Sequence, residues 1–185
     1  YNDKVLNDFN DFKTSEIINE SSQDMKYMRN SLLPGLLKAV SFNEKRGQGY
    51  FKLFEIGRVH SLMKSYNKEE DNMGFIWYGE NKEHWNSKFI ADVFYAKGEV
   101  LSLLKQLKVI DISFKVEESD FSDTNINIYS KKTCIGFIRL LNSKLKEKYN
   151  IKGPIVVSEL SIDKIRKNIL KDFQYKNISS FPSVG

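Results

Sequence analysis

The chain has 185 residues, 41% of them hydrophobic and 29% charged, and this balance excludes an intrinsically disordered protein. The net charge of +5 comes from lysines and arginines scattered along the chain, which favours an ordinary solvated surface over a dedicated nucleic-acid patch. A lone cysteine, Cys134, excludes an internal disulfide, and no apolar run reaches the ~18 residues that span a bilayer. We expect a cytoplasmic protein and, since the chain starts without methionine, a segment of a longer one.

The first clear element is an amphipathic helix over residues 31–46, after a possible short strand at 15–19. Ser31 is predicted to be its N-cap, and Pro34 falls in the first turn, where the missing N–H of proline is not needed. The apolar residues that repeat at helical spacing are Leu33, Leu36, Leu37 and Val40. One face of this helix is therefore expected to be buried.

Two strands and a second helix follow. Aromatic and branched residues predict strands at 50–60 and 73–80, which could pair antiparallel across a polar loop. Residues 92–107 have helical periodicity, and Asp92 lies near the start. The residues expected on its repeating face are Phe94, Lys97, Val100, Leu101 and Leu104.

The second half of the chain is rich in strands. The pattern predicts strands at 109–118, 126–130, 133–141 and 153–162. Short helices or turns are expected at 142–151 and 163–170, and the tail from residue 175 is expected to be extended. Strands that follow one another through turns, with helices between them, predict an α+β fold whose mostly antiparallel sheet is flanked by helices.

Residue patterns of common catalytic and metal sites are absent from the sequence. Cys134, His60 and His84 are too far apart and too few for a structural zinc site. The Gly-Gln-Gly at 47–49 lacks the lysine of a phosphate-binding loop, so we interpret it as a turn. We assign no catalytic, cofactor-binding or metal-binding residue.

Three charged residues adjoin apolar segments: Arg29 precedes the first helix, and Glu55 and Arg58 lie in the first strand. Each could simply meet a local partner. Alternatively, Arg29 could tie the helix start to a neighbouring segment through a forked hydrogen bond, which lysine cannot make.

Two motifs carry a resemblance to a known family. Residues 28–37 read MRNSLLPGLL and residues 53–59 read LFEIGRV, and both resemble the β chain of bacterial phenylalanyl-tRNA synthetase. Downstream, Trp85 and DVFYAKGEV at 92–100 resemble the same chain, as does YNIKGPIVVSELSID at 149–163. His60 departs from the family pattern, which has Phe or Tyr there.

The resemblance implies a function and partners. The family's β chain pairs with an α chain, two of each, and the enzyme uses ATP and magnesium to attach L-phenylalanine to tRNA(Phe). The α chain carries the active site. The module seen here would be a class II synthetase-like core that serves as a scaffold. It lacks the rest of the ATP-binding motif after FEIGRVH and any Gly-x-Gly-x-Gly-x-Arg, so nothing stabilises charge on a triphosphate.

The resemblance also divides the chain and suggests residues with structural roles. Residues 1–176 would be the catalytic-like module, and 177–185 would begin the junction to an anticodon-binding-like domain. Gly35 would allow a close backbone approach. The motif residues with structural roles would be Arg29, Ser31, Pro34, Gly35, Glu55, Gly57 and Arg58. The alternative is a stand-alone binding or regulatory protein built on a degenerate class II fold.

Overall fold

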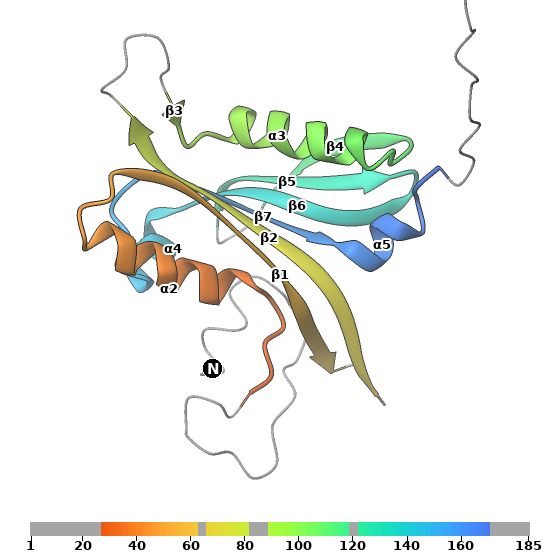
Figure 1. Cartoon of the computed structure of the whole chain (residues 1–185), viewed down its shortest axis with the longest axis horizontal. Coiled ribbons are helices and arrows are strands. Elements are labelled where there is room, and N and C mark those ends of the chain that lie inside the picture. Colours follow the sequence, from red (N-terminus) through yellow and green to blue (C-terminus); the bar gives the residue numbers. More distant parts are fainter. Residues whose placement is uncertain (1–26, 63–65, 82–88, 119–121, 171–185) are drawn as a thin grey trace, which may run out of the picture.

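The computed structural model describes residues 27–62, 66–81, 89–118 and 122–170 (Figure 1). The strand expected at 15–19, the tail and the junction at 177–185 lie outside the described residues. So do His84 and Trp85.

The described strands form one antiparallel sheet in the order β1-β2-β7-β6-β5-β4, and β3 pairs with the end of β2. The strands are β1 (Tyr50–Leu62), β2 (Asn67–Asn81), β3 (Phe89–Ile90), β4 (Ile112–Glu117), β5 (Ser122–Ser130), β6 (Thr133–Leu141) and β7 (Ile155–Ser161). β7 runs through the middle, and all seven of its residues are buried. The predicted α+β fold with an antiparallel sheet is confirmed.

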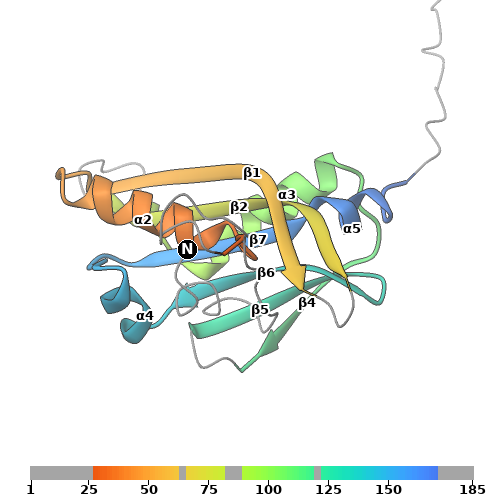
Figure 2. The same ribbon diagram turned by 90° about the horizontal axis from the view of Figure 1, so that it is seen from below.

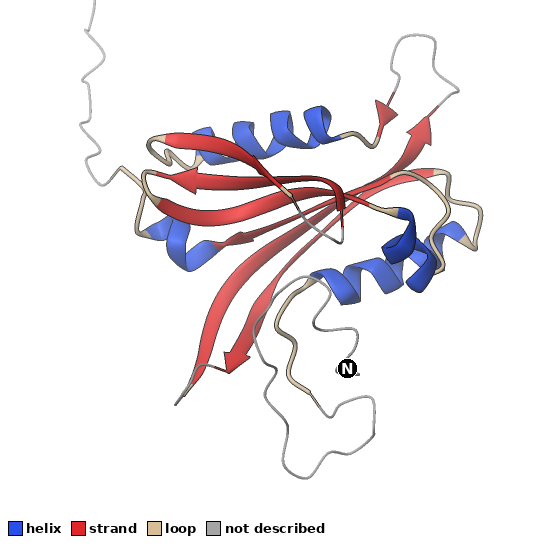
Figure 3. Ribbon diagram, turned by 180° about the vertical axis from the view of Figure 1, so that it is seen from behind, coloured by secondary structure: helices blue, strands red, loops and turns tan. Residues whose placement is uncertain are grey.

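Helices cover both faces of this sheet (Figures 1 and 3). On one face lie α2 (Leu33–Glu44) and α4 (Ser143–Lys148), and on the other lies α3 (Val93–Gln106). The short α5 (Ile162–Arg166) continues directly from β7. Each face therefore has its own apolar core, and none of the described helices is long and apolar enough to cross a membrane.

Helix α2 begins two residues later than predicted. Its N-cap position is Leu32, which makes no side-chain cap, so the expected N-cap role of Ser31 is wrong. The Ser31 hydroxyl instead donates to Glu159 and accepts from the backbone N–H of Leu33. Pro34 does lie in the first turn. The predicted stripe is confirmed, because all four of its apolar residues are buried.

The β1–β2 hairpin is longer than the sequence suggested. The polar stretch expected to be a loop is mostly strand, since β1 extends to Leu62 and β2 begins at Asn67. Apolar alternation stops there because cross-strand polar pairs take its place, such as Arg58 opposite Asp71. Strands held together by such polar pairs lack the apolar alternation from which strands are predicted.

Helix α3 starts as predicted, and its buried face overlaps the predicted one at Val100 and Leu104. Asp92 is its N-cap and accepts from the backbone N–H of Tyr95. Phe94, expected on the inner face, is 85% exposed. The buried residues are Val93, Ala96, Val100 and Leu104. Val93 and Ala96 therefore occupy the inward positions that were predicted for Phe94 and Lys97.

Candidate functional site

The segment before α2 is fastened to β1 by Arg29. Its Nη1 lies 2.6 Å from Glu55 Oε1, and its Nε donates to the backbone carbonyl of Arg58 at 2.9 Å. The backbone carbonyl of Arg29 accepts from the N–H of His60 at 2.8 Å. The sequence left two interpretations open, and the structure has the forked contact, in which two nitrogens of the Arg29 guanidinium donate to one side-chain acceptor and one backbone acceptor.

Gly57 makes room for this contact. A Cβ at Gly57 would lie 2.3 Å from Nη2 of Arg29 and 3.3 Å from a methyl carbon of Leu32. Gly74 on β2 makes room for Leu36 of α2, because a Cβ at Gly74 would lie 2.9 Å from a methyl carbon of Leu36. The close approaches thus lie in the sheet under α2. Gly35 sits in the first turn of α2, half-buried, and its expected close contact stays a prediction.

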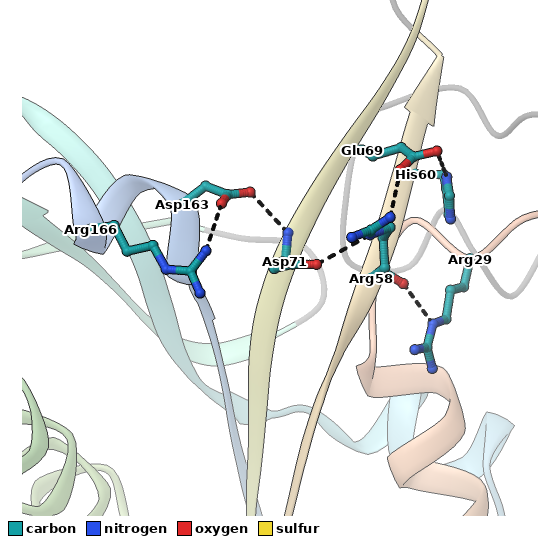
Figure 4. Close-up of polar contacts among 7 residues, drawn as sticks. All are labelled: Arg29, Arg58, His60, Glu69, Asp71, Asp163 and Arg166. Carbon is teal, nitrogen blue, oxygen red and sulfur yellow. Dashed lines mark hydrogen bonds and ion pairs between the residues drawn. The ribbon is translucent and has the colours of Figure 1, made fainter.

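Arg58 extends the charged network across the hairpin (Figure 4). Its guanidinium contacts Glu69 at 3.0 Å and Asp71 at 3.2 Å, both on β2. The backbone N–H of Asp71 in turn donates to Asp163 of α5 at 3.0 Å. The Arg58 side chain is well exposed, so these ion pairs fix strand geometry and contribute little stability.

Glu159, the most deeply buried carboxyl group of the network, was not among the residues predicted from the sequence. Glu159 lies on β7, 4% exposed, and accepts hydrogen bonds from the Ser31 hydroxyl at 2.5 Å and from Asn72 Nδ2 at 2.8 Å. The backbone N–H of Leu32 also points at it, 3.4 Å away. Glu159 therefore ties the start of α2 and strand β2 to the central strand. A single charged residue inside an otherwise uncharged strand was the signal available in the sequence.

Burial raises the pKa of the Glu159 carboxyl above its usual value of 4.5, although its hydrogen bonds to Ser31 and Asn72 act in the opposite direction. Above pH 4.5 the unfolded chain loses a proton that the native protein keeps. We therefore expect the free energy of unfolding to fall as the pH rises from 4.5 through the native pKa. Urea unfolding of the wild type at stepped pH values measures this slope.

A glutamine at position 159 cannot titrate, so Glu159→Gln should remove this part of the pH dependence. Glu147→Gln is the matched control, because Glu147 is exposed on α4. The explanation fails if the difference in unfolding free energy between wild type and Glu159→Gln is constant across the pH series.

Glu159 also lines a hollow of about 160 Å³ on the α2 face of the sheet. Its polar lining residues include Ser61, Glu70, Asn72, Ser161 and Lys164. The lining described by the structure contains no arginine, and Lys164 is its one cation. The hollow is smaller than the ~300–1,000 Å³ usual for small-molecule sites and carries mainly acidic and neutral groups.

His60 and Cys134, rejected above as zinc ligands, each contact a different partner. His60 Nδ1 lies 3.8 Å from Glu69 Oε1, whereas the Cys134 thiol donates to the carbonyl of Gly136 at 3.6 Å. In the part of the chain that the structure describes, no group of three or more His, Cys, Asp or Glu is arranged to hold a metal ion. The contacts of Arg29, Arg58 and Glu159 hold the segment before α2, the β1–β2 hairpin and β7 together.

A second notable surface is an apolar patch on edge strand β1, on the side of α3. Phe54 and Ile56 are 72% and 64% exposed, and they define what we call the β1 patch. They lie opposite Phe75 and Met73 of β2. Neighbouring Lys52 donates to the hydroxyl of Tyr95 on α3 at 2.7 Å, which places the patch beside that helix. Large adjacent apolar side chains left in water are typical of an interaction surface.

Comparison with protein families gives one match that covers most of the chain. The model of the "Phenylalanyl tRNA synthetase beta chain CLM domain" matches residues 1–162.

Curated relatives point the same way. The phenylalanine–tRNA ligase beta subunit of Photorhabdus laumondii is 32% identical over 173 residues, which are 89% of this chain and 22% of that protein. The subunit of Carboxydothermus hydrogenoformans is 30% identical over 177 residues, 93% of this chain and 22% of that one. That of Ehrlichia canis is 30% identical over 157 residues, 82% of this chain and 20% of that one. The chain thus spans about a fifth of the length of these relatives.

Among solved structures, the chain is similar to PylSc of Desulfitobacterium hafniense, a pyrrolysyl tRNA synthetase. The TM-score is 0.64 at 15% sequence identity, and the match covers 84% of this chain and 53% of that one. A second structure of the pyrrolysyl-tRNA synthetase from this organism gives 0.63 at 15% identity, over 83% of this chain and 52% of that one. At such low identity the likeness concerns the fold alone.

Proposed function

Because this chain belongs to the phenylalanyl-tRNA synthetase β-chain family, we propose that it is the non-catalytic core module of a β subunit in an enzyme that attaches L-phenylalanine to tRNA(Phe). The chain is a segment of such a β chain, about a fifth of its relatives' length. In this proposal two α and two β subunits form a cytoplasmic enzyme, and the active site that uses ATP and magnesium lies in the α subunit.

The observation that carries the non-catalytic role is the chemistry of the Glu159 hollow. It lies beside β1, whose FEIGRVH sequence resembles the first strand of an ATP-binding motif, and Val59 and Ser61 of that strand line it. Adenylate formation needs cationic groups on the triphosphate. The hollow offers Glu70 and buried Glu159 against a single Lys164. Similarity to the fold of a pyrrolysyl tRNA synthetase supports a class II-type core without supporting activity.

The β1 patch supports a role in assembly. Permanent subunit interfaces typically bury ~2,000 Å² or more and are richer in apolar groups than ordinary surface. Phe54 and Ile56 offer such groups on an edge strand, and aromatic side chains often dominate binding energy. We assign this patch to contact with the α subunit.

The experiment is co-expression of the complete β chain with its α chain, followed by gel filtration and an aminoacylation assay. The wild-type pair should assemble and charge tRNA(Phe). Combined Phe54→Ala and Ile56→Ala substitutions should weaken α–β association by about tenfold or more, because truncating interface anchors typically costs over 1 kcal/mol each. Their melting temperature should change little, since both side chains are exposed.

Val116→Ala on β4, the opposite edge of the sheet, is the matched control, because Val116 is also exposed. If Val116→Ala weakens α–β association as much as the two β1 substitutions do, the assignment of the β1 patch to the α–β interface is wrong. Phenylalanine-dependent ATP–pyrophosphate exchange by the purified 185-residue chain alone would contradict the non-catalytic role.

A further inference from the structure

The net positive charge of this chain comes from two segments that meet at one end of the α2 face. Residues 33–46 and 143–152 together contain seven Lys or Arg and two Glu, a net charge of +5. The whole chain, with 29 basic and 24 acidic residues, also has a net charge of +5, so all its other residues together are neutral. These two segments are α2 and α4 with their ends, about a hundred residues apart in sequence.

The fold brings the two segments together. Figures 1 and 2 show α2 and α4 at the same end of the sheet, and the Ser41 hydroxyl of α2 donates to the carbonyl of Asn150 after α4 at 3.5 Å. Between them lies a hollow of about 430 Å³, which we call the basic hollow. Its lining residues are Lys38, Ser41, Phe42, Lys45, Lys148, Tyr149 and Asn150.

The basic hollow combines exposed cations with an exposed aromatic ring. Lys38, Lys45 and Lys148 are all exposed. Phe42 is 55% exposed, although it sits on a helix whose other large apolar residues are buried. The guanidinium carbon of Arg46 lies 3.4 Å from the centre of the Phe42 ring. A cation stacked on an aromatic ring that lines the hollow offers both charge and a planar surface.

One of the two acidic residues in these segments is directed away from the hollow. The Glu44 carboxylate accepts from the backbone N–H groups of Lys152 at 3.1 Å and of Gly153 at 3.3 Å. Its charge is used to hold the α2 end against the connection between α4 and β7. It is not among the residues that line the basic hollow, and neither is Glu147 of α4.

We propose that the basic hollow binds RNA and, on the basis of the proposed function, that this RNA is the tRNA of the complete enzyme. Lysines neutralise backbone phosphates, and exposed aromatic rings and arginine planes stack on unpaired bases. An acidic protein surface would complement the charge but would offer no bases to Phe42 and Arg46. The combination of features therefore favours RNA.

The test is fluorescence anisotropy of a labelled tRNA(Phe) transcript titrated with the 185-residue chain at several salt concentrations. Combined Lys45→Gln and Lys148→Gln substitutions should weaken binding by about tenfold and reduce the slope of log K against log salt by about 1–2. The control combines Lys105→Gln on α3 with Lys132→Gln in the β5–β6 turn. Both of these lysines are exposed and outside the hollow, and the pair should change affinity less than twofold.

A second pair of variants tests the aromatic surface. Phe42→Ala should weaken tRNA binding by about tenfold if a base stacks there. Phe94→Ala, which removes an even more exposed phenylalanine from the opposite face, should have no effect. Poly-glutamate serves as the comparison ligand, and its binding should be weaker than that of the transcript and insensitive to Phe42→Ala.

If the two pairs of lysine substitutions reduce the affinity for tRNA equally, the proposal is overturned, because binding would then depend on the overall charge of the chain and not on the basic hollow. Poly-glutamate binding as tight as that of tRNA would also overturn it, in favour of an acidic polypeptide. Failure here is separable from failure of the proposed function. If the α–β enzyme charges tRNA and the variants of the basic hollow bind RNA as the wild type does, only the proposal that the basic hollow binds RNA is refuted. An α–β pair that cannot charge tRNA refutes the proposed function, while the anisotropy result still decides the hollow.

Discussion

Leu37→Ala should lower the free energy of unfolding by about 2–5 kcal/mol, the range for a buried leucine whose removal leaves a cavity. Leu37 is fully buried and belongs to the core between α2, α4 and the sheet, with Val40, Leu145 and Tyr149. Since this cluster joins elements far apart in sequence, the lost contacts cannot be replaced within the helix. Denaturant unfolding followed by circular dichroism measures the change.

Lys38→Ala is the control for this prediction. Lys38 is the next residue on the same helix and is exposed, so its replacement should change the free energy of unfolding by no more than about 0.5 kcal/mol. If the denaturation midpoints of Leu37→Ala and Lys38→Ala are the same, the assignment of the buried face of α2 is wrong.

Gly136→Ala is expected to be the second most damaging substitution. A Cβ at this position would lie 2.4 Å from the carbonyl oxygen of Glu159 and 2.9 Å from the Cα of Leu160, both on the paired strand β7. These atoms belong to the backbone and cannot rotate away as a side chain could. The two central strands would have to separate, and we expect a loss of about 3 kcal/mol in the free energy of unfolding.

Gly98→Ala is the same chemical change, but we expect it to raise the free energy of unfolding. Gly98 lies within α3, and nothing approaches a Cβ there within 4 Å. Alanine should therefore stabilise the protein by about 0.5–1 kcal/mol through its better helix propensity. A Gly136→Ala variant as stable as Gly98→Ala would show that β6 and β7 tolerate a wider spacing than the structure has.

Predictions from local patterns were the most accurate for this chain. The stripe of α2, the cap of α3 at Asp92 and strand β1 all depend on residues within a few positions of one another. The motifs at 28–37 and 53–59 carried the family resemblance for the same reason, since each is contiguous. Periodicity is less informative where two stripes compete. On α3, Val100 and Leu104 are buried as predicted, whereas Phe94 is exposed and Ala96 is buried in its place.

Local signals thus predicted most elements, the α+β class and the family, although they misplaced the α2 cap and shortened the β1–β2 hairpin. Which distant residues meet becomes clear only in the folded chain. Ser31 and Glu159 are 128 positions apart, yet the Ser31 hydroxyl donates to the Glu159 carboxyl group just before α2 begins. Lys38, Lys45 and Lys148 are far apart in the sequence, yet they line one hollow. Charges and buried carboxyl groups act through space, so their role depends on which strands and helices the sheet brings together.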